Sequence, residues 1–300
     1  MSFTQSLRRS AVDIEARLDF LIGQESGGRV PLRLRGAMRY AVLGGGKRIR
    51  PFLVIETAKM FGVPALGSID AACTLECIHC YSLVHDDLPS MDNDEVRRGR
   101  PTLWKAYDEW TAILAGDALL TLAFEILARP ETHSDPSVRA ELVLLVARAS
   151  GAAGMVGGQV VDLEADKLGV PAAPSLAHIR DLQAMKTGAL IRVACEAGAA
   201  LGRATTSERD ALQRYGDALG FAFQIADDLL DADGDAATVG KAVGKDASAG
   251  KATLVSLMGI DAARAKLKEV ETEAISSLAP FGSRAATLID AARFVAQRTS

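Results

Sequence analysis

The chain is poor in several features that would direct its fold toward β-structure. Asparagine occurs once, at Asn93, and aromatic residues make up 5% of the 300 residues. No Asn-Gly or Asp-Gly pair is flanked by alternating apolar residues, and strand and helix patterns do not alternate, so β-hairpin and α/β classes are disfavoured. A P-loop of the form GxxxxGK[ST] is also missing, which excludes a nucleotide site of that type.

Cysteine is scarce, and its spacing does not favour a metal centre. Cys73, Cys77 and Cys80 recur at intervals of four and three residues, which places them on one face of a helix. A structural zinc site would need a second pair of ligands, and Cys195 stands alone. We therefore expect these small side chains to belong to the core.

The chain lacks the net positive charge typical of nucleic-acid binding and the long apolar run typical of a membrane span. The net charge is −4 and the pI is near 5.7, which disfavours a nucleic-acid partner. No uninterrupted apolar stretch approaches the roughly 20 residues of a membrane span. Residues 1–20 alternate charged and apolar side chains and lack the apolar core of a signal peptide. We expect a cytoplasmic protein without stable membrane insertion.

What the chain does contain is helix after helix. It is 49% hydrophobic and 24% charged, and apolar residues recur every three or four positions. The clearest examples are residues 34–43, 110–128, 139–150 and 211–231. Connections are short and no low-complexity linker separates two halves, so we predict one all-α domain over residues 1–300. Helix packing is the expected role of most glycines in 151–158.

The segment VHDDLPSMDNDEVRRGRPT, residues 84–102, sorts its charges into an acidic block and then a basic one. Asp86 and Asp92 are six residues apart, a separation that a continuous helix would splay. Pro89 predicts that the helix ends near Leu88 and that Asp92 turns back toward Asp86.

A second acid cluster, Asp227, Asp228 and Asp231, ends another apolar helix. Asp227 and Asp231 are four residues apart, about 6 Å on one helical face, where like charges repel unless a cation lies between them. Oxygen-only clusters suit a hard cation such as Mg²⁺, which bridges carboxylates to phosphate oxygens.

A phosphate-bearing ligand also requires basic residues, and these accompany both clusters. They are Lys47, Arg48, Arg50, Arg97, Arg98, Lys186, Lys241, Lys245 and Lys251.

Together these motifs resemble those of the trans-prenyltransferases, or polyprenyl diphosphate synthases, and are most similar to the bacterial farnesyl diphosphate synthases. The matching segments follow the family's order: GGKRIRP (45–51), CIHCYSLVHDDLPSMDNDEVRRGRPT (77–102), AGDALL (115–120), GMVGGQVVDLEAD (154–166), KTGALI (186–191), GFAFQIADDLLD (220–231) and GKAVGKDASAGKAT (240–253). The resemblance implies an all-α isoprenoid synthase bundle around a central cavity, with the acid clusters facing each other at its mouth, and a homodimer.

The resemblance also implies roles for individual residues. Asp86 and Asp92 would hold two Mg²⁺ ions, and Asp227 with Asp231 a third, with Asp87 and Asp228 completing the clusters; Mn²⁺ is an alternative. The isopentenyl diphosphate site would comprise Lys47, Arg50, His79 and Arg98. The allylic diphosphate site would comprise Arg97, Lys186, Thr187, Gln224, Lys241 and Lys251, with Gln159 and Asp162 as a polar pair facing it.

The implied reaction is head-to-tail prenyl transfer, in which isopentenyl diphosphate condenses with dimethylallyl or geranyl diphosphate to give farnesyl diphosphate and pyrophosphate. Magnesium and basic side chains would stabilise the departing pyrophosphate, and no nucleophilic side chain is required.

Product length is expected to depend on cavity depth below the first acid cluster. Tyr81 lies five residues before Asp86, about 7.5 Å along a helix. Helix phase leaves its direction open, because Tyr81 lies about 140° round from Asp86 whereas Ser82 lies nearly beneath it. A Tyr-Ser pair at this place resembles the farnesyl synthases.

Alternative functions stay open. A geranylgeranyl diphosphate synthase would share every motif, and a non-catalytic subunit of a heteromeric synthase would typically have lost one acid cluster. An HD-type phosphohydrolase would need more metal-binding histidines. Three departures from close relatives, Glu95, Trp104 and Leu254, remove no implied metal ligand.

Overall fold

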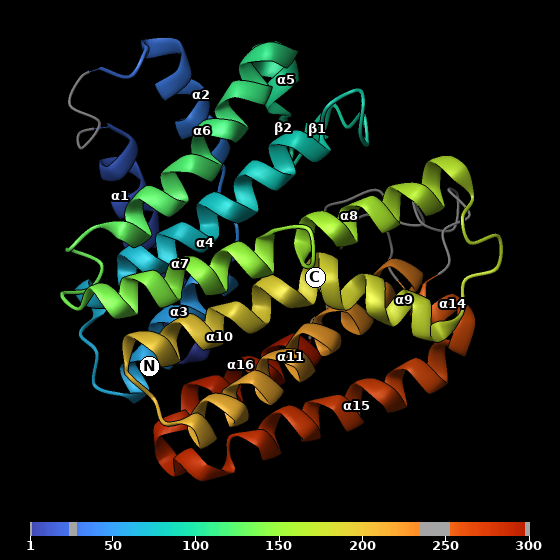
Figure 1. Cartoon of the computed structure of the whole chain (residues 1–300). Coiled ribbons are helices and arrows are strands. Elements are labelled where there is room, and N and C mark those ends of the chain that lie inside the picture. Colours follow the sequence, from blue (N-terminus) through green and yellow to red (C-terminus); the bar gives the residue numbers. More distant parts are fainter. Residues whose placement is uncertain (1, 24–28, 234–252, 298–300) are drawn as a thin grey trace. The chain divides into compact units, whose positions relative to one another are not determined.

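The computed structural model describes residues 2–23, 29–233 and 253–297. α-Helices dominate this part of the chain, which confirms the all-α expectation (Figure 1). Its contacts divide into two compact units, Met1–Val143 with Ala200–Gly202, and Leu144–Ala199 with Arg203–Ser300. The single domain over residues 1–300 stays a prediction.

The first unit is built around one buried helix, α4. It contains α1 (Phe3–Gly23), α2 (Leu32–Val42), α3 (Ile49–Met60), α4 (Ala65–Asp86), β1 (Val96–Arg97), β2 (Arg100–Pro101), α5 (Leu103–Ala106), α6 (Glu109–Ala128) and the start of α7 (Pro136–Ser150). α4 packs against α1, α2, α3 and α6, and α6 lies beside it along its length (Figure 1). An apolar surface nearly all round suits a helix in this central position.

A two-stranded hairpin follows α4 and was not predicted from the sequence. β1 and β2 are antiparallel, with Arg97 opposite Arg100. Arg98 and Gly99 form the turn between them with φ values of 54° and 72°. Strands of two residues are too short to produce the alternation by which strands are predicted.

The second unit is arranged around the long helix α11. It contains the end of α7, α8 (Met155–Leu163), η1 (Glu164–Leu168), α9 (Leu176–Gln183), η2 (Ala184–Gly188), α10 (Ala189–Leu201, its last two residues in the first unit), α11 (Thr206–Asp233), α14 (Leu254–Met258), α15 (Ile260–Ser277), η3 (Ala279–Ala285) and α16 (Ala286–Ala296). α11 packs against α15, α16 and η2. It begins five residues before the predicted segment 211–231 and contains the whole of it.

Two helical stretches, Glu109–Ala128 and Pro136–Leu168, are long and apolar enough by composition to cross a membrane. Asp117 and Glu125 interrupt the first stretch and Arg148 interrupts the second, so neither contradicts the expectation that no uninterrupted apolar run reaches this length. Burial accounts for much of the apolar surface, because half of the first window and a third of the second are buried inside the protein. Core helices of soluble proteins have the same composition, so these stretches are weak evidence of a membrane span.

Candidate active site

At the end of α4 a local hydrogen bond brings the backbones of Asp86 and Asp92 together. α4 ends at Asp86, two residues before the predicted Leu88. The backbone N–H of Asp92 donates to the carbonyl of Asp86 at 2.8 Å. This bond confirms that the chain turns back after the helix, as Pro89 predicted.

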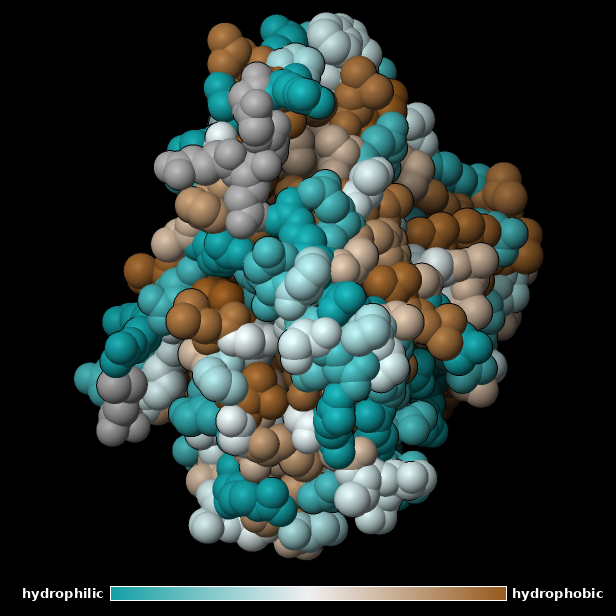
Figure 2. Space-filling view, turned by 60° about the vertical axis from the view of Figure 1, so that its left-hand side comes forward, coloured by the Kyte–Doolittle hydropathy of each residue, from teal (hydrophilic) through white to brown (hydrophobic). Residues whose placement is uncertain are grey.

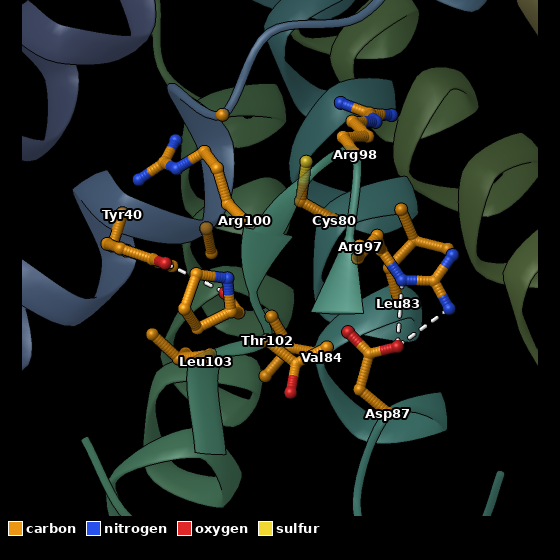
Figure 3. Close-up of a pocket in the computed structure, with 13 residues that line it drawn as sticks. Tyr40, Cys80, Leu83, Val84, Asp87, Arg97, Arg98, Arg100, Thr102 and Leu103 are labelled. Carbon is orange, nitrogen blue, oxygen red and sulfur yellow. Dashed lines mark hydrogen bonds and ion pairs between the residues drawn. The ribbon is translucent and has the colours of Figure 1, made fainter. Parts of the chain in front are cut away.

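Asp87 forms the main ion pair of this cluster. Its carboxylate oxygen Oδ1 lies 2.6 Å from Arg97 Nη2 and 2.7 Å from Arg97 Nε, and the two side chains point toward each other in Figure 3. Burial raises the pKa of the Asp87 carboxyl, and Arg97 opposes that shift. Asp94 stands further off, with Oδ2 at 3.6 Å from Arg97 Nη2. Arg97 thus neutralises the charge of a desolvated carboxylate.

Arg98, the next residue, reaches a different partner, the glycine loop before α3. Its Nη1 donates to the carbonyl of Gly45. Gly46 has a φ of 134°, and a Cβ there would stand 2.6 Å from Arg98 Nη1. Only glycine permits this approach, which gives the loop before Lys47 a structural reason.

The hairpin, the glycine loop and the end of α4 enclose one pocket of the first unit (Figure 3). It holds about 480 Å³ of space, part of it open to solvent. Its lining combines apolar and charged side chains: Tyr40, Ala41, Gly44, Cys80, Leu83, Val84, Asp87, Arg97, Arg98, Arg100, Pro101, Thr102 and Leu103. Two of the expected diphosphate ligands, Arg97 and Arg98, therefore border a common hollow.

The basic run at the start of α3 divides between surface and core. Lys47 is exposed and Arg50 is half-buried, whereas Arg48 between them is only 3% exposed. Arg48 has a left-handed backbone, with a φ of 50°, and its guanidinium contacts Glu76, Glu15 and the carbonyl of Val42. Arg48 is thus part of the framework that holds Lys47 and Arg50.

His79 lies on α4 in a strongly basic environment. Its pKa is well below the usual value, first because desolvation disfavours the imidazolium and then because Arg50 and Arg98 stand nearby. Without an anion the ring is therefore neutral at pH 7. A bound diphosphate would raise its pKa again.

Tyr81 and Ser82 point in different directions from α4. Tyr81 is 6% exposed, and its ring meets the imidazole of His85 edge to face at 5.8 Å between centroids. Ser82 is half-buried and donates its hydroxyl to the carbonyl of His79 at 2.9 Å within the same helix. Of the two candidates for setting product length, Tyr81 therefore has the bulkier side chain.

The second acid cluster lies near the end of α11, inside the second unit. α11 continues to Asp233, so Asp227 and Asp231 share one helix as predicted. Asp228 is 9% exposed and accepts from the backbone N–H of Leu254 at 2.9 Å and from Gln183 Nε2 at 3.5 Å. Asp228 thus joins α11 to α9 and to the start of α14.

Lys186 lies on the π-helical turn η2 and pairs with Asp162 on α8 at 2.6 Å. A Cβ on Gly158 would stand 2.3 Å from the backbone N of Lys186, so glycine is required where α8 and η2 cross. This confirms the packing role expected of these glycines for Gly158. Gln159 is half-buried, and its Oε1 and Nε2 find no hydrogen-bond partner within residues 2–23, 29–233 and 253–297. Such an orphaned amide fits a ligand group.

Two further candidate ligands of the allylic diphosphate, Thr187 and Gln224, lie in the second unit. Thr187 lies on η2 beside Lys186, and Gln224 lies half-buried on α11. Gly188 and Gly220 bring η2 and α11 together, since a Cβ on Gly220 would stand 2.9 Å from the Cα of Gly188. Lys241 and Lys251, like Lys245, lie outside the described residues.

The donors at both clusters fit Mg²⁺, since they are carboxylate oxygens. Among the described residues, no three histidine, cysteine, aspartate or glutamate side chains gather closely enough to hold a metal by themselves. Magnesium is usually bound by one or two carboxylates together with water and phosphate oxygens, which fits this arrangement. The cysteines are core residues as predicted; all four are buried, and burial raises the pKa of Cys77 to about 12.

Sequence reasoning missed three residues of this region. Glu76 was not singled out, although it is the buried partner of Arg48. His85 and Gly116 were not given roles, although they meet between α4 and α6. His85 and Gly116 could have been noticed because they lie in two of the segments that match the family, VHDD and AGDALL.

Comparison with known proteins agrees with the family suggested by the motifs. The family model described as Polyprenyl synthetase matches residues 31–279. The chain is 47% identical over 246 residues to the farnesyl diphosphate synthase of Escherichia coli (strain K12), covering 80% of each chain. It is 39% identical over 294 residues to geranylgeranyl pyrophosphate synthase 3, chloroplastic, of Arabidopsis thaliana, covering 97% of this chain and 80% of the relative. The apo crystal structure of an FPP/GFPP synthase from Zymomonas mobilis matches with a TM-score of 0.88 and 44% identity, covering 98% of each chain.

Proposed function

The chain belongs to the polyprenyl synthetase family, and we propose that it is a farnesyl diphosphate synthase. It would condense isopentenyl diphosphate with dimethylallyl diphosphate and then with geranyl diphosphate. The observation that carries this proposal is the end of α4, where Asp92 folds back onto Asp86 beside the hairpin that presents Arg97 and Arg98. Carboxylates that could bind magnesium and guanidiniums that could bind phosphate are thus close together, as the binding of a metal-bound diphosphate requires.

The division of roles follows from these surroundings. Asp86 and Asp92 would bind magnesium together with the allylic diphosphate, and Asp227 with Asp231 would do so from the second unit. We propose that the two clusters face each other across a shared cavity. When bound, Mg²⁺ would supply Lewis-acid stabilisation of the charge that develops on the leaving diphosphate.

The bonding changes need no nucleophile from the protein. The bond between C1 of the allylic substrate and its diphosphate oxygen breaks, and pyrophosphate leaves with the electron pair. The double bond of isopentenyl diphosphate attacks C1 through its C4, and a proton is then lost from its C2 to the departing pyrophosphate. Lys47, Arg50 and Arg98 would hold the isopentenyl diphosphate, while apolar side chains exclude water from the cation.

A fifteen-carbon product is favoured over a longer one by the buried ring of Tyr81 on α4, five residues before Asp86. A ring at that depth would stop the growing chain after about two additions. A geranylgeranyl diphosphate synthase, with a twenty-carbon product, is the alternative, since a geranylgeranyl pyrophosphate synthase aligns with nearly the whole chain.

The direct test is to incubate the protein with Mg²⁺, isopentenyl diphosphate and each allylic starter in turn, and to identify the products by mass spectrometry. We expect farnesyl diphosphate as the main product, loss of turnover with a chelator, and recovery with Mg²⁺ or Mn²⁺. Asp86→Asn should lower kcat by about 100-fold or more, whereas Asp261→Asn, at an exposed position of α15, should not. Absence of turnover with every starter would overturn the proposal, and a twenty-carbon main product would favour the alternative.

We also propose that two copies form a cytoplasmic homodimer through the outer face of α6. Trp110, Ile113 and Leu114 are 57%, 43% and 50% exposed within its first turns. Figure 2 shows that the visible face of the protein carries brown apolar areas beside teal polar ones. A second copy of α6 would remove these three from water.

Sedimentation equilibrium would test this contact. Leu114→Asp should shift the mass from dimer to monomer, whereas Leu66→Asp, at an isolated site that is 84% exposed, should leave the dimer intact. A monomeric wild-type protein would contradict the proposal.

A further inference from the structure

His85 and Gly116 belong to two of the sequence motifs, VHDD and AGDALL, yet the proposed reaction gives neither a role. They meet where α4 and α6 lie side by side (Figure 1). The helices are antiparallel: near one end Thr74 Oγ1 donates to the carbonyl of Ala123 at 3.3 Å. Near the other end His85 Nε2 lies 3.1 Å from the carbonyl oxygen of Ile113. A carbonyl only accepts, so Nε2 carries the proton in this bond.

The close approach of His85 depends on Gly116. A Cβ built on Gly116 would stand 2.1 Å from His85 Nε2, 2.5 Å from Cδ2 and 2.9 Å from Cε1. Carbon and nitrogen atoms that are not bonded do not approach this closely. Any side chain at position 116 would therefore displace the imidazole from the backbone of α6.

The imidazole also contacts the ring of Tyr81. The two residues are four apart on α4, so their side chains lie on one face of the helix. Their rings meet at 5.8 Å between centroids and 79° between planes, the edge-to-face arrangement that aromatic rings prefer. His85 thus contacts both the backbone of α6 and the ring of Tyr81.

We propose that His85 and Gly116 are positioning residues that hold the Tyr81 ring across the path of the growing product, and so take part in setting its length. The inference rests on the proposed function, because it assigns to this contact the control of where that reaction stops. Tyr81 is the obstacle, His85 fixes its orientation, and Gly116 provides the space in which His85 lies.

A comparison of product ratios would test the coupling. The wild type, His85→Ala, Gly116→Ala and the double variant would be assayed with isopentenyl and geranyl diphosphates, and the ratio of twenty- to fifteen-carbon product measured. Each single variant should raise that ratio about two- to tenfold, the range that one aromatic edge contact corresponds to. In the double variant Gly116→Ala should add nothing to His85→Ala, because the ring with which its methyl group collides is gone.

Controls separate this effect from general damage. Gly67→Ala also replaces a helical glycine, here on α4 rather than α6, but its Cβ would meet nothing nearer than 3.4 Å. The ratio of twenty- to fifteen-carbon product should therefore stay at the wild-type value. Sedimentation would check that each variant keeps the wild-type oligomeric state. If Gly116→Ala fails to fold, His85→Ala alone still decides whether the imidazole matters.

The outcomes distinguish the inference from the proposal beneath it. If Tyr81→Ala lengthens the products while the His85 and Gly116 variants do not, the positioning role is wrong and the role of Tyr81 survives. If Gly116→Ala raises the ratio as much in the absence of His85 as in its presence, the coupling is wrong. If the wild type condenses no substrate at all, the failure lies in the proposed function.

Discussion

Arg97 reaches back from the hairpin to Asp87 at the end of α4, and the shortest distance between their charged atoms is 2.6 Å. An implied member of the metal cluster and an implied diphosphate ligand thus neutralise each other in the structure. Asp94, the other carboxylate close to Arg97, is 30% exposed against 5% for Asp87. The three residues therefore offer a matched pair of substitutions.

Asp87→Asn should lower the free energy of unfolding by about 1–3 kcal/mol, because it leaves the half-buried guanidinium of Arg97 without its main charged partner. Asp94→Asn should change it by less than about 1 kcal/mol, since its contact with Arg97 is longer and more solvated. Urea unfolding followed by circular dichroism would measure both. Equal effects of the two substitutions would mean that burial does not govern the strength of this pair.

Arg48→Met should be among the most damaging single substitutions in the first unit. It leaves Glu76, whose side chain is 3% exposed, charged without a partner, and removing one member of a buried pair costs about 3–5 kcal/mol. Lys59→Met breaks the pair with Glu56, in which the lysine is 69% exposed, and should cost less than about 1 kcal/mol. Because Arg48 also holds the loop before α3, the KM for isopentenyl diphosphate should rise in a folded Arg48→Lys variant. An unchanged KM would limit Arg48 to a role in stability.

His79 should make the stability of the protein depend on pH below neutrality. The pKa of this imidazole is lowered in the folded state, first by desolvation and then by neighbouring arginines. The unfolded chain therefore takes up a proton near pH 6.5 that the folded protein does not, and stability is lost as the pH falls below that value. Between pH 7 and pH 5 the free energy of unfolding should fall more steeply in the wild type than in His79→Gln, by up to about 1.4 kcal/mol per pH unit. Parallel curves for the two proteins would show that His79 is protonated equally in both states.

Tyr81→Ala should shift the main product from fifteen to twenty or more carbons, because it removes the side chain that we propose limits the cavity. Tyr107→Ala deletes the same atoms from the segment between α5 and α6, where the ring contacts Tyr40 and Arg33, and should leave the product length unchanged. Chromatography of the dephosphorylated products would measure the distribution. If neither variant alters it, the end of the cavity lies elsewhere.

Much of the site could be predicted because the relevant interactions are local. The helical class follows from apolar periodicity, and Pro89 indicated the turn that returns Asp92 to Asp86, a contact between residues only six apart. Asp227 and Asp231 could be placed on one face because α11 continues through both. The hairpin was missed, since two residues per strand carry no pattern.

The sequence by itself determined the helices, the two acid clusters and the charge of their neighbours, because composition and short-range spacing decide these. Tertiary structure alone decided that Arg48 is buried while Lys47 is exposed, and that Arg97 pairs with Asp87. It also placed the ring of Tyr81 against the imidazole of His85, which bonds to the backbone of α6. Such contacts depend on which side chains separate helices bring within hydrogen-bonding distance. The spacing of residues within a single helix does not contain that information.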